Sequence, residues 1–204
     1  MSSLPDILVE AFRAREVFMP DGTKTAMHSN ISEEECQRLY GEVRRLKPAV
    51  SLEVGFAQGI STLAILKALH DNGQGHHHVI DPFQGEFGNC GLAMVEKSGL
   101  GNRFTFHGKF PEEVIPSLPT LQFAFIDSSH LFDLTLCDFV LTDKRMDIGG
   151  LVGFHDLWMP SLKTLLQFIM ANRDYEYHSS KRENMVLIRK KANDARDWRH
   201  FEPF

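Results

Sequence analysis

Short apolar runs alternate with stretches of helical spacing from residue 49 to residue 190, and this alternation constrains the fold more than any other feature of the sequence. The run 49–55 is suited to a parallel strand buried on both faces, and the run 121–127 has the same character. Further strands are predicted over 77–81, 103–107 and 149–155, and helices over 59–70, 89–98, 131–146 and 160–172, with another helix beginning at Pro111. This order of elements predicts an α/β fold, with a doubly wound, mostly parallel sheet covered on both faces.

The two ends of the chain depart from this pattern. Residues 174–178 and 185–190 predict two closing strands, which we expect to form an antiparallel hairpin. Residues 4–16 predict a short helix. The polar segment Met19–Asn30, with its Asp21-Gly22 turn, predicts a loop.

Domain organisation follows from length and from one helix start. Ser32 and Glu35 form a capping box, which predicts a helix that closes before Pro48. A chain of 204 residues suits one α/β domain. We therefore expect a single domain over 1–204, in which a core spans 48–190. The flanking parts are an N-terminal helical segment, 1–47, and a C-terminal tail, 191–204.

Composition excludes several classes of partner. The net charge of -5 makes the chain a poor candidate for binding nucleic acid. No stretch approaches the roughly twenty apolar residues of a membrane span, and the first residues lack the pattern of a signal peptide. Three widely spaced cysteines are typical of reduced thiols, so we expect a cytoplasmic protein. The adjacent Lys190 and Lys191 are expected on a solvated surface.

The segment from Glu53 to Gly59 follows the first buried strand and opens a helix. Gly55 permits a tight turn, and Gly59 begins a helix whose free N–H groups favour an anion. The spacing is G-x-x-x-G, not the G-x-G-x-x-G of dinucleotide-binding proteins, and it fits a single carboxylate better than a pyrophosphate. Glycines after a strand are common, so the motif alone leaves a purely structural role open.

An acidic residue stands at the end of the next strand. Asp81 could accept both hydroxyls of a ribose, as acids at this place do in dinucleotide folds, or it could belong to a surface turn before Pro82. Taken together, the glycine motif and Asp81 favour a nucleoside cofactor.

These residues and two later motifs resemble those of class I S-adenosylmethionine-dependent methyltransferases. The segments Phe-Ile-Asp127-Ser-Ser-His130 and Gly149-Gly-Leu-Val-Gly-Phe-His155-Asp156 extend the match. From about Met27 to Arg189 the chain is similar to the bacterial small-molecule O-methyltransferases related to the catechol and caffeoyl-coenzyme A enzymes. The resemblance implies a Rossmann-like fold and methyl transfer from S-adenosylmethionine to a hydroxyl of a small-molecule acceptor.

The resemblance also implies roles for individual residues. Ser61 would contact the cofactor carboxylate, Asp81 would hold the ribose, Asp127 would face the sulfonium and the acceptor, and Met27–Ser29 would close over the site as a lid. The implied cofactor site consists of Glu53, Gly55, Phe56, Gln58, Gly59, Ser61, Asp81, Phe83, Gly108, Phe110 and Asp127.

His130 stands where metal-dependent relatives carry the lysine of a D-x-x-K motif, which acts as general base. Histidine is a sensible replacement, because its reference pKa of about 6.5 suits general base catalysis near neutral pH. Asp127 and His130 are therefore the candidate catalytic residues, although His130 could instead cap the following helix.

A divalent metal such as magnesium or manganese is a second possibility that the resemblance raises. Relatives bind it through an acid matching Asp127 and an Asp-Asn pair matching Asp156 and position 157, but here Leu157 replaces the asparagine. His155 could supply the missing ligand only if it points into the site, and neighbours on a strand point to opposite faces. Asp127, Asp156 and His155 are the candidate metal ligands, and Asp156 could instead orient the acceptor or His130.

Other functions stay open at this point. A nicotinamide-dependent oxidoreductase shares the strand–helix order and the acid, and a non-catalytic cofactor-binding module shares the fold. The run His76–His78 is more simply the start of a surface strand than a metal site, since consecutive strand residues alternate faces. The resemblance suggests a homodimer, and the sequence does not identify the acceptor.

Overall fold

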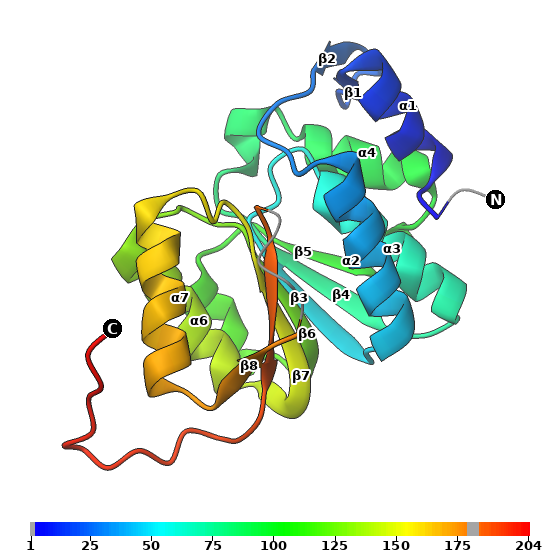
Figure 1. The fold of residues 1–204 in the computed structure, drawn as a ribbon. Helices are drawn as coiled ribbons and strands as arrows, with labels where there is room; N and C mark the ends of the chain where they lie inside the picture. Colours follow the sequence, from blue (N-terminus) through cyan, green and yellow to red (C-terminus); the bar gives the residue numbers. More distant parts are fainter. Residues whose placement is uncertain (1–2, 179–183) are drawn as a thin grey trace. The chain divides into compact units, whose positions relative to one another are not determined.

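The computed structural model describes residues 3–178 and 184–204 and divides into two units, Met1–Phe110 and Pro111–Phe204 (Figure 1). Three parallel strands form the centre of the first unit. β4 (His76–Ile80) pairs with β3 (Val50–Val54) on one side and with β5 (Phe104–His107) on the other. These strands begin and end within a residue or two of the predicted boundaries.

Helices complete the first unit. α3 (Ile60–Asn72) packs against α2 (Glu33–Leu46) and α4 (Cys90–Ser98). α3 is buried over most of its surface, as expected for a helix that is apolar almost all round. α2 begins at the predicted capping box, because the Ser32 hydroxyl accepts from Glu35 N–H and the Glu35 carboxylate accepts from Ser32 N–H. The short 3₁₀ turns are η1 (Gln84–Phe87) and η2 (Gly101–Arg103).

The N-terminal segment contains a hairpin that the sequence did not predict. After α1 (Asp6–Ala14), β1 (Glu16–Phe18) pairs antiparallel with β2 (Lys24–Ala26) around the Asp21-Gly22 turn. The prediction of a loop over Met19–Asn30 is therefore wrong at β2. The strand Lys-Thr-Ala is too short and too polar to carry an alternating pattern, and its pairing with β1 supplies the structure.

Two parallel strands and an antiparallel pair form the sheet of the second unit. β6 (Leu121–Ile126) pairs parallel with β7 (Met146–Phe154), β9 (Val186–Lys190) pairs antiparallel with β7, and β8 (Tyr175–Tyr177) pairs antiparallel with β9. The predicted C-terminal antiparallel hairpin is thus confirmed. The helical elements of this unit are α5 (Pro111–Val114), η3 (Ile115–Ser117), α6 (Phe132–Asp143) and α7 (Pro160–Asn172).

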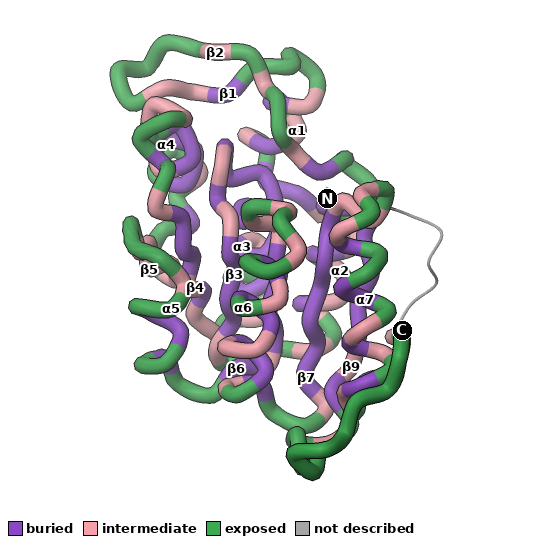
Figure 2. Tube along the Cα trace, turned by 90° about the vertical axis from the view of Figure 1, so that its left-hand side faces the viewer, coloured by how far each residue is buried: buried purple, intermediate pink, exposed green. Residues whose placement is uncertain are grey.

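β7 begins three residues before the predicted start at residue 149. Its register with β6 shifts between the pairs Leu121–Met146 and Phe123–Leu151, so the intervening glycines lie within an irregular strand rather than before it. Gly149 has a φ of 88°, which glycine adopts at little cost. α6 and α7 pack against each other, and the strands are the most buried part of the unit (Figures 1 and 2).

A buried ion pair corrects the prediction for Lys190. Its side chain is 3% exposed, and its ammonium group donates to the Asp143 carboxylate at 3.0 Å and to the carbonyl oxygens of Asp143 and Met146. Lys191 is exposed, as expected. The difference arises because Lys190 is the last residue of β9 and points into the core, whereas Lys191 follows the strand and pairs with Glu176 on the surface. Among the residues described, no helix has the length and apolar character needed to cross a membrane.

Candidate functional site

The loop Gly55–Gly59, here called the glycine loop, joins β3 to α3 and has an unusual backbone. Gly55, Ala57 and Gly59 all have positive φ angles, of 95°, 42° and 77°. A side chain at Gly59 would meet the Phe56 ring at 3.0 Å and the Gly91 carbonyl oxygen at 3.2 Å. The two predicted glycines are therefore required by conformation, and Gly59 also by close packing. The loop presents the N-terminus of α3, where backbone N–H groups are available to an anion.

Asp81 holds this loop in place. One oxygen, Oδ2, accepts from the N–H groups of Phe56 and Ala57 at 3.1 and 3.0 Å, and Oδ1 accepts from Phe83 N–H at 2.8 Å. A carboxylate offers about four acceptor positions, so these bonds leave about one for a ligand. Asp81 is therefore buried, and its hydrogen bonds hold the backbone of the glycine loop. The sequence suggested instead that Asp81 lies in a surface turn or binds both ribose hydroxyls.

Glu53 and Ser61 are bonded to each other. The Glu53 carboxylate is fully buried and accepts hydrogen bonds from the hydroxyls of Ser61 and Thr62, both in the first turn of α3. It also lies 3.0 Å from Nε2 of His77, whose Nδ1 lies 2.9 Å from the Ser51 hydroxyl. Glu53 thus joins β3 to the start of α3 from within the core. His77 is wholly buried, so the expectation that the histidine run lies on the surface is wrong for His77, whereas His76 and His78 are partly exposed.

Gln58 connects the glycine loop to the N-terminal segment. Its side-chain amide donates to Ala26 C=O at 3.0 Å and accepts from His28 N–H at 2.7 Å. The His28 ring stacks on Phe87 with a centroid separation of 6.1 Å. The structure therefore places the segment Met27–Ser29, the predicted lid, against the glycine loop.

Two exposed aromatic side chains come from the segments that follow β4 and β5. Phe83 and Phe110 are 51% and 47% exposed, and their rings meet edge to face at a centroid separation of 5.9 Å. Gly108, two residues before Phe110, directly follows β5. Exposed rings offer apolar faces on which another ring can stack, so these residues are candidates to contact an aromatic ligand.

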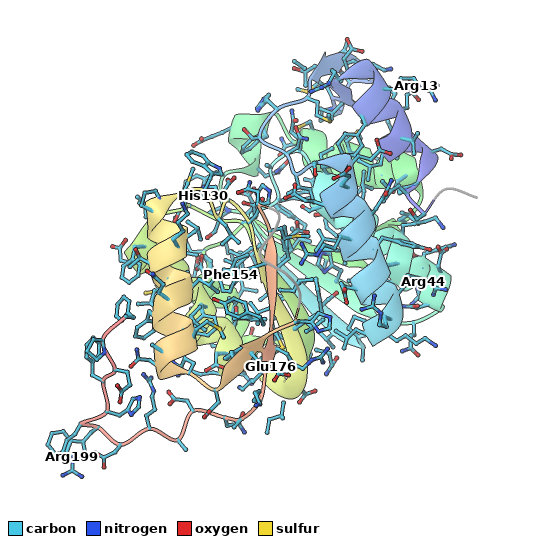
Figure 3. The ribbon with its side chains drawn as sticks, in the orientation of Figure 1. Arg13, Arg44, His130, Phe154, Glu176 and Arg199 are labelled. Atoms are coloured by element: carbon cyan, nitrogen blue, oxygen red, sulfur yellow. The ribbon has the colours of Figure 1, made fainter. Side chains whose placement is uncertain are left out.

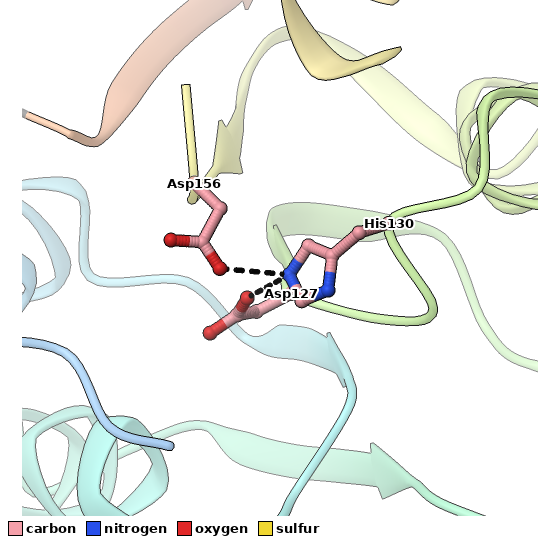
Figure 4. A group of neighbouring side chains, drawn as sticks. All are labelled: Asp127, His130 and Asp156. Carbon is pink, nitrogen blue, oxygen red and sulfur yellow. Dashed lines mark hydrogen bonds and ion pairs between the residues drawn. The ribbon is translucent and has the colours of Figure 1, made fainter. Parts of the chain in front are cut away.

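The second unit brings together Asp127, His130 and Asp156, here called the carboxylate–histidine cluster (Figure 4). Nε2 of His130 lies 3.1 Å from Oδ1 of Asp127 and 3.0 Å from Oδ2 of Asp156. Asp127 follows β6, Asp156 follows β7, and His130 precedes α6 beside the first turn of α7 (Figure 3). The neighbouring Phe154, the last residue of β7, is buried in the core of this unit.

Local interactions fix an unusual backbone at the cluster. His130 and Asp156 have φ angles of 61° and 56°, in the left-handed region that non-glycine residues rarely adopt. The Ser161 hydroxyl donates to His130 C=O at 2.7 Å, and the Ser128 hydroxyl donates to the Asp138 carboxylate at 2.7 Å. These bonds tie the loop that carries Asp127 and His130 to α7 and to α6.

His155 also reaches the cluster, contrary to the strand argument against it. Its Nδ1 lies 3.5 Å from Oδ2 of Asp127 and 3.5 Å from Oδ1 of Asp156. Residues 155 and 156 were expected to be neighbours on a strand, with side chains on opposite faces. β7 ends at Phe154, and the left-handed backbone of Asp156 turns its side chain to the same side as that of His155.

Asn184 is a site residue that sequence reasoning missed. Its amide donates to Oδ1 of Asp156 at 2.9 Å, accepts from Trp158 N–H at 3.3 Å and lies 3.3 Å from Nε2 of His155. Trp158 is 63% exposed, and its indole N–H donates to Asp156 at 2.8 Å. No local motif marks Asn184, because it lies just before β9 and 28 residues after Asp156 in the chain.

The contacts within the carboxylate–histidine cluster shift the pKa values of Asp127 and His130. Burial raises the pKa of Asp127, but hydrogen bonds from His130 and His155 outweigh it and hold the pKa at about 2. The hydrogen bond to Asp127 raises the pKa of His130 above its ordinary value, against the opposing effect of burial. The cluster is therefore suited to hold a positive charge between two carboxylates.

The same atoms could hold a divalent ion. One ligand atom each from Asp127, His130 and Asp156 lies within 4.8 Å of the others. Ligands bound at roughly 2.0–2.2 Å are separated by up to about 4.4 Å, so small movements would complete such a site. Two carboxylates and one or two imidazoles suit manganese as well as magnesium. The residues thus fit the metal that the sequence resemblance raised.

Comparison with known proteins agrees with this geometry. The model of a protein family described as "Methyltransferase domain" matches residues 52–157, which include the glycine loop and the carboxylate–histidine cluster. Among curated proteins, none matches the sequence. The family match confirms the resemblance to methyltransferases and favours it over a nicotinamide-dependent oxidoreductase.

Solved structures share the fold. The SAH-bound Podospora anserina methyltransferase PaMTH1 superposes with a TM-score of 0.73 at 16% identity, covering 93% of this chain and 89% of that one. The SAH complex of a Bacillus cereus O-methyltransferase gives 0.67 at 12% identity, covering 93% and 92%. The SAM complex of TomG, an O-methyltransferase of tomaymycin synthesis in Streptomyces achromogenes, gives 0.62 at 15% identity, covering 80% and 82%. The predicted Rossmann-like α/β class is thereby confirmed.

Proposed function

Because the chain belongs to the methyltransferase domain family, we propose that it is an S-adenosylmethionine-dependent enzyme that methylates a hydroxyl group of a small molecule. The observation that carries the proposal is the carboxylate–histidine cluster, which lies within the matched residues and offers a base or a metal site for a hydroxyl. O-methyltransferases with SAM or SAH bound share the fold, which supports the choice of cofactor and of reaction.

The first unit would bind the cofactor. The N–H groups at the start of α3 favour its carboxylate. The Ser61 hydroxyl, in that turn, already donates its hydrogen bond to Glu53, so its O–H is not available to donate to the cofactor carboxylate as well. Asp81 has about one acceptor position left, which suits one ribose hydroxyl. Phe83 and Phe110 offer exposed rings for the adenine.

The second unit would activate the acceptor. When bound, S-adenosylmethionine supplies an electrophilic methyl group on its sulfonium. Nε2 of His130 contacts both carboxylates and is best assigned as the protonated nitrogen, so Nδ1 is the atom that would take the acceptor proton. As the O–H bond breaks, the oxygen would keep the electron pair and attack the methyl carbon, and the bond from that carbon to sulfur would break with its electron pair left on sulfur as a neutral thioether. Asp127 and Asp156 then stabilise the imidazolium.

A metal would use the same carboxylates in another way. Asp127 and Asp156, with His130 or His155, would hold magnesium or manganese, which would lower the pKa of a coordinated acceptor hydroxyl. Both uses need the carboxylate oxygens that now face His130. Base and metal are therefore alternatives for one site.

The experiment that tests the proposal is calorimetric titration with S-adenosylmethionine and S-adenosylhomocysteine, each with and without magnesium or manganese. We expect saturable binding of both compounds to the wild-type chain. Asp81→Ala should abolish it, because the variant loses the ribose contact and releases the glycine loop. Asp71→Ala is the matched control, since Asp71 is an acid on the far part of α3.

The titration and a turnover assay test the cofactor and the reaction separately. Failure of both compounds to bind under every condition would refute the cofactor assignment. Binding without turnover on any panel of phenols, catechols and sugar alcohols would instead favour a non-catalytic module. A cytoplasmic location and a homodimer are further parts of the proposal, and fractionation and sedimentation equilibrium test them.

A further inference from the structure

The histidine run on β4 divides between the two faces of the first unit's sheet. His77 points to the face that carries Glu53 and is fully buried. His76 and His78, two residues apart, point to the opposite face, as strand geometry requires. Their rings lie 5.1 Å apart and meet at 61°.

A third histidine joins them from the neighbouring strand. His78 is in register with Thr105 on β5, and His107 lies two residues further along the same face. Nδ1 of His78 lies 3.1 Å from Nε2 of His107, and the two rings stack at 5.4 Å and 28°. The Thr105 hydroxyl lies 2.8 Å from Nε2 of His76 and orients that ring.

We propose that His76, His78 and His107 form a nitrogen-donor site for a divalent transition-metal ion such as zinc or nickel. Two histidines at alternate positions of one strand and a third on the next strand share one face of the sheet, which three consecutive strand residues cannot. In the described residues one nitrogen from each ring does not lie within 4.8 Å of the others, so binding an ion requires rotation of the rings, chiefly that of His76. Ring nitrogens bound to one ion at about 2.0–2.1 Å stand roughly 3.3 Å apart in tetrahedral geometry, close to the separation of His78 and His107.

Charge and access agree with this assignment. All three side chains are partly exposed. Burial and the neighbouring histidines lower the pKa of His78 to about 4, and burial also lowers the pKa of His76 and of His107. These shifts favour the neutral imidazole, which is the form that binds a metal ion. Arg103 and Lys109 add positive charge nearby, which limits the affinity for a cation.

The site differs in chemistry from the carboxylate–histidine cluster. Its donors are imidazole nitrogens, which suit zinc, nickel and copper, whereas magnesium prefers oxygen. It shares no residue with the cluster. Its success or failure is therefore independent of the proposed methyl transfer.

The test is calorimetric titration of the full-length chain with nickel and, separately, with zinc. The Asp156→Asn and Cys137→Ser double variant serves as background, because it weakens the carboxylate site and removes the exposed thiol. We expect one equivalent of either ion to bind, with magnesium in excess unable to compete. His78→Gln or His107→Gln should weaken binding at least about 10-fold, and His70→Gln, an exposed histidine of α3, should leave it unchanged.

Two results would overturn the proposal: no saturable binding of nickel or zinc, or binding that survives in both His78→Gln and His107→Gln. Thermal unfolding and cofactor titration of each variant show whether it is folded. If His78→Gln does not fold, His107→Gln at the end of β5 decides the matter alone, and Thr105→Val, which releases the His76 ring, should give a smaller loss.

Discussion

Nε2 of His130 lies 3.0 Å from Oδ2 of Asp156, although the two residues follow different strands. The contact exists because both residues adopt left-handed backbone conformations at the ends of their segments, which turn the side chains toward each other. Such strained conformations persist only where surrounding interactions hold them, and they concentrate at functional sites. The relationship leads to predictions for His130, for its titration and for the residue that holds Asp156.

Replacing His130 should separate chemistry from cofactor binding. If His130 is the base, His130→Ala and His130→Gln should each lower turnover by about 10²- to 10⁴-fold. The affinity for S-adenosylmethionine should be nearly unchanged, because the residues proposed to bind it lie in the first unit. Steady-state kinetics on the best acceptor and calorimetry on the same samples measure the two effects.

The exposed His200, in the C-terminal tail, provides the control, and His200→Gln should retain full turnover. A loss of cofactor affinity in His130→Ala comparable to the loss of turnover would contradict a base role. A metal requirement that disappears together with His130 would point instead to a ligand role.

The titration of His130 should depend on Asp127. Their hydrogen bond raises the pKa of His130, so Asp127→Asn should move that pKa down toward about 6.5. A raised pKa in the folded state stabilises the protein most at acidic pH, and this contribution is lost as pH rises through the folded value. Turnover through a neutral base should change in the opposite sense and increase over the same interval.

Histidine NMR titration measures this shift directly. The chain has ten histidines, so the His130 resonance is assigned by its absence in His130→Gln. An unchanged His130 pKa in Asp127→Asn would show that the hydrogen bond does not control its protonation.

Much of this site could be predicted from the sequence because its residues follow strands. Glycines and acids at the ends of buried strands mark the sheet edge where such folds bind ligands, and Asp81, Asp127 and Asp156 all lie at such ends. The sequence also predicted the order of strands and helices, since apolar periodicity is a local property.

What the sequence did not reveal depends on tertiary contacts. His155 joins the site because β7 ends one residue earlier than predicted and Asp156 adopts a positive φ, and neither feature has a local signature. Tertiary structure also determines the surroundings of the histidine run. His77 contacts Glu53 in the core, and His78 contacts His107, which lies on a strand that is distant in sequence and adjacent only in the fold.

Asn184 should prove to be a positioning residue for the acceptor side. Asn184→Leu removes the hydrogen bonds to Asp156 and Trp158 while keeping a side chain of similar size. We expect turnover to fall about 10-fold, as the loss of one or two hydrogen bonds suggests, with cofactor affinity unchanged. Steady-state kinetics resolve whether the loss lies in kcat or in the acceptor KM.

Asn193→Leu, in the exposed tail, is the matched control and should have no effect on turnover. A purely structural role for Asn184 would instead lower thermal stability and leave kcat and KM of the folded enzyme intact.

The ion pair of Lys190 with Asp143 should dominate the stability of the second unit. Lys190→Met leaves the buried Asp143 carboxylate without its nearest ammonium and leaves the carbonyl oxygens of Asp143 and Met146 without a donor. Removing one partner of a buried pair typically costs about 3–5 kcal/mol. Its neighbour Lys191 pairs with Glu176 at 3.6 Å on the surface, so Lys191→Met should cost about 0–1 kcal/mol. Urea unfolding of the two variants measures both values, and equal effects would show that the Lys190 pair is no stronger than a solvated one.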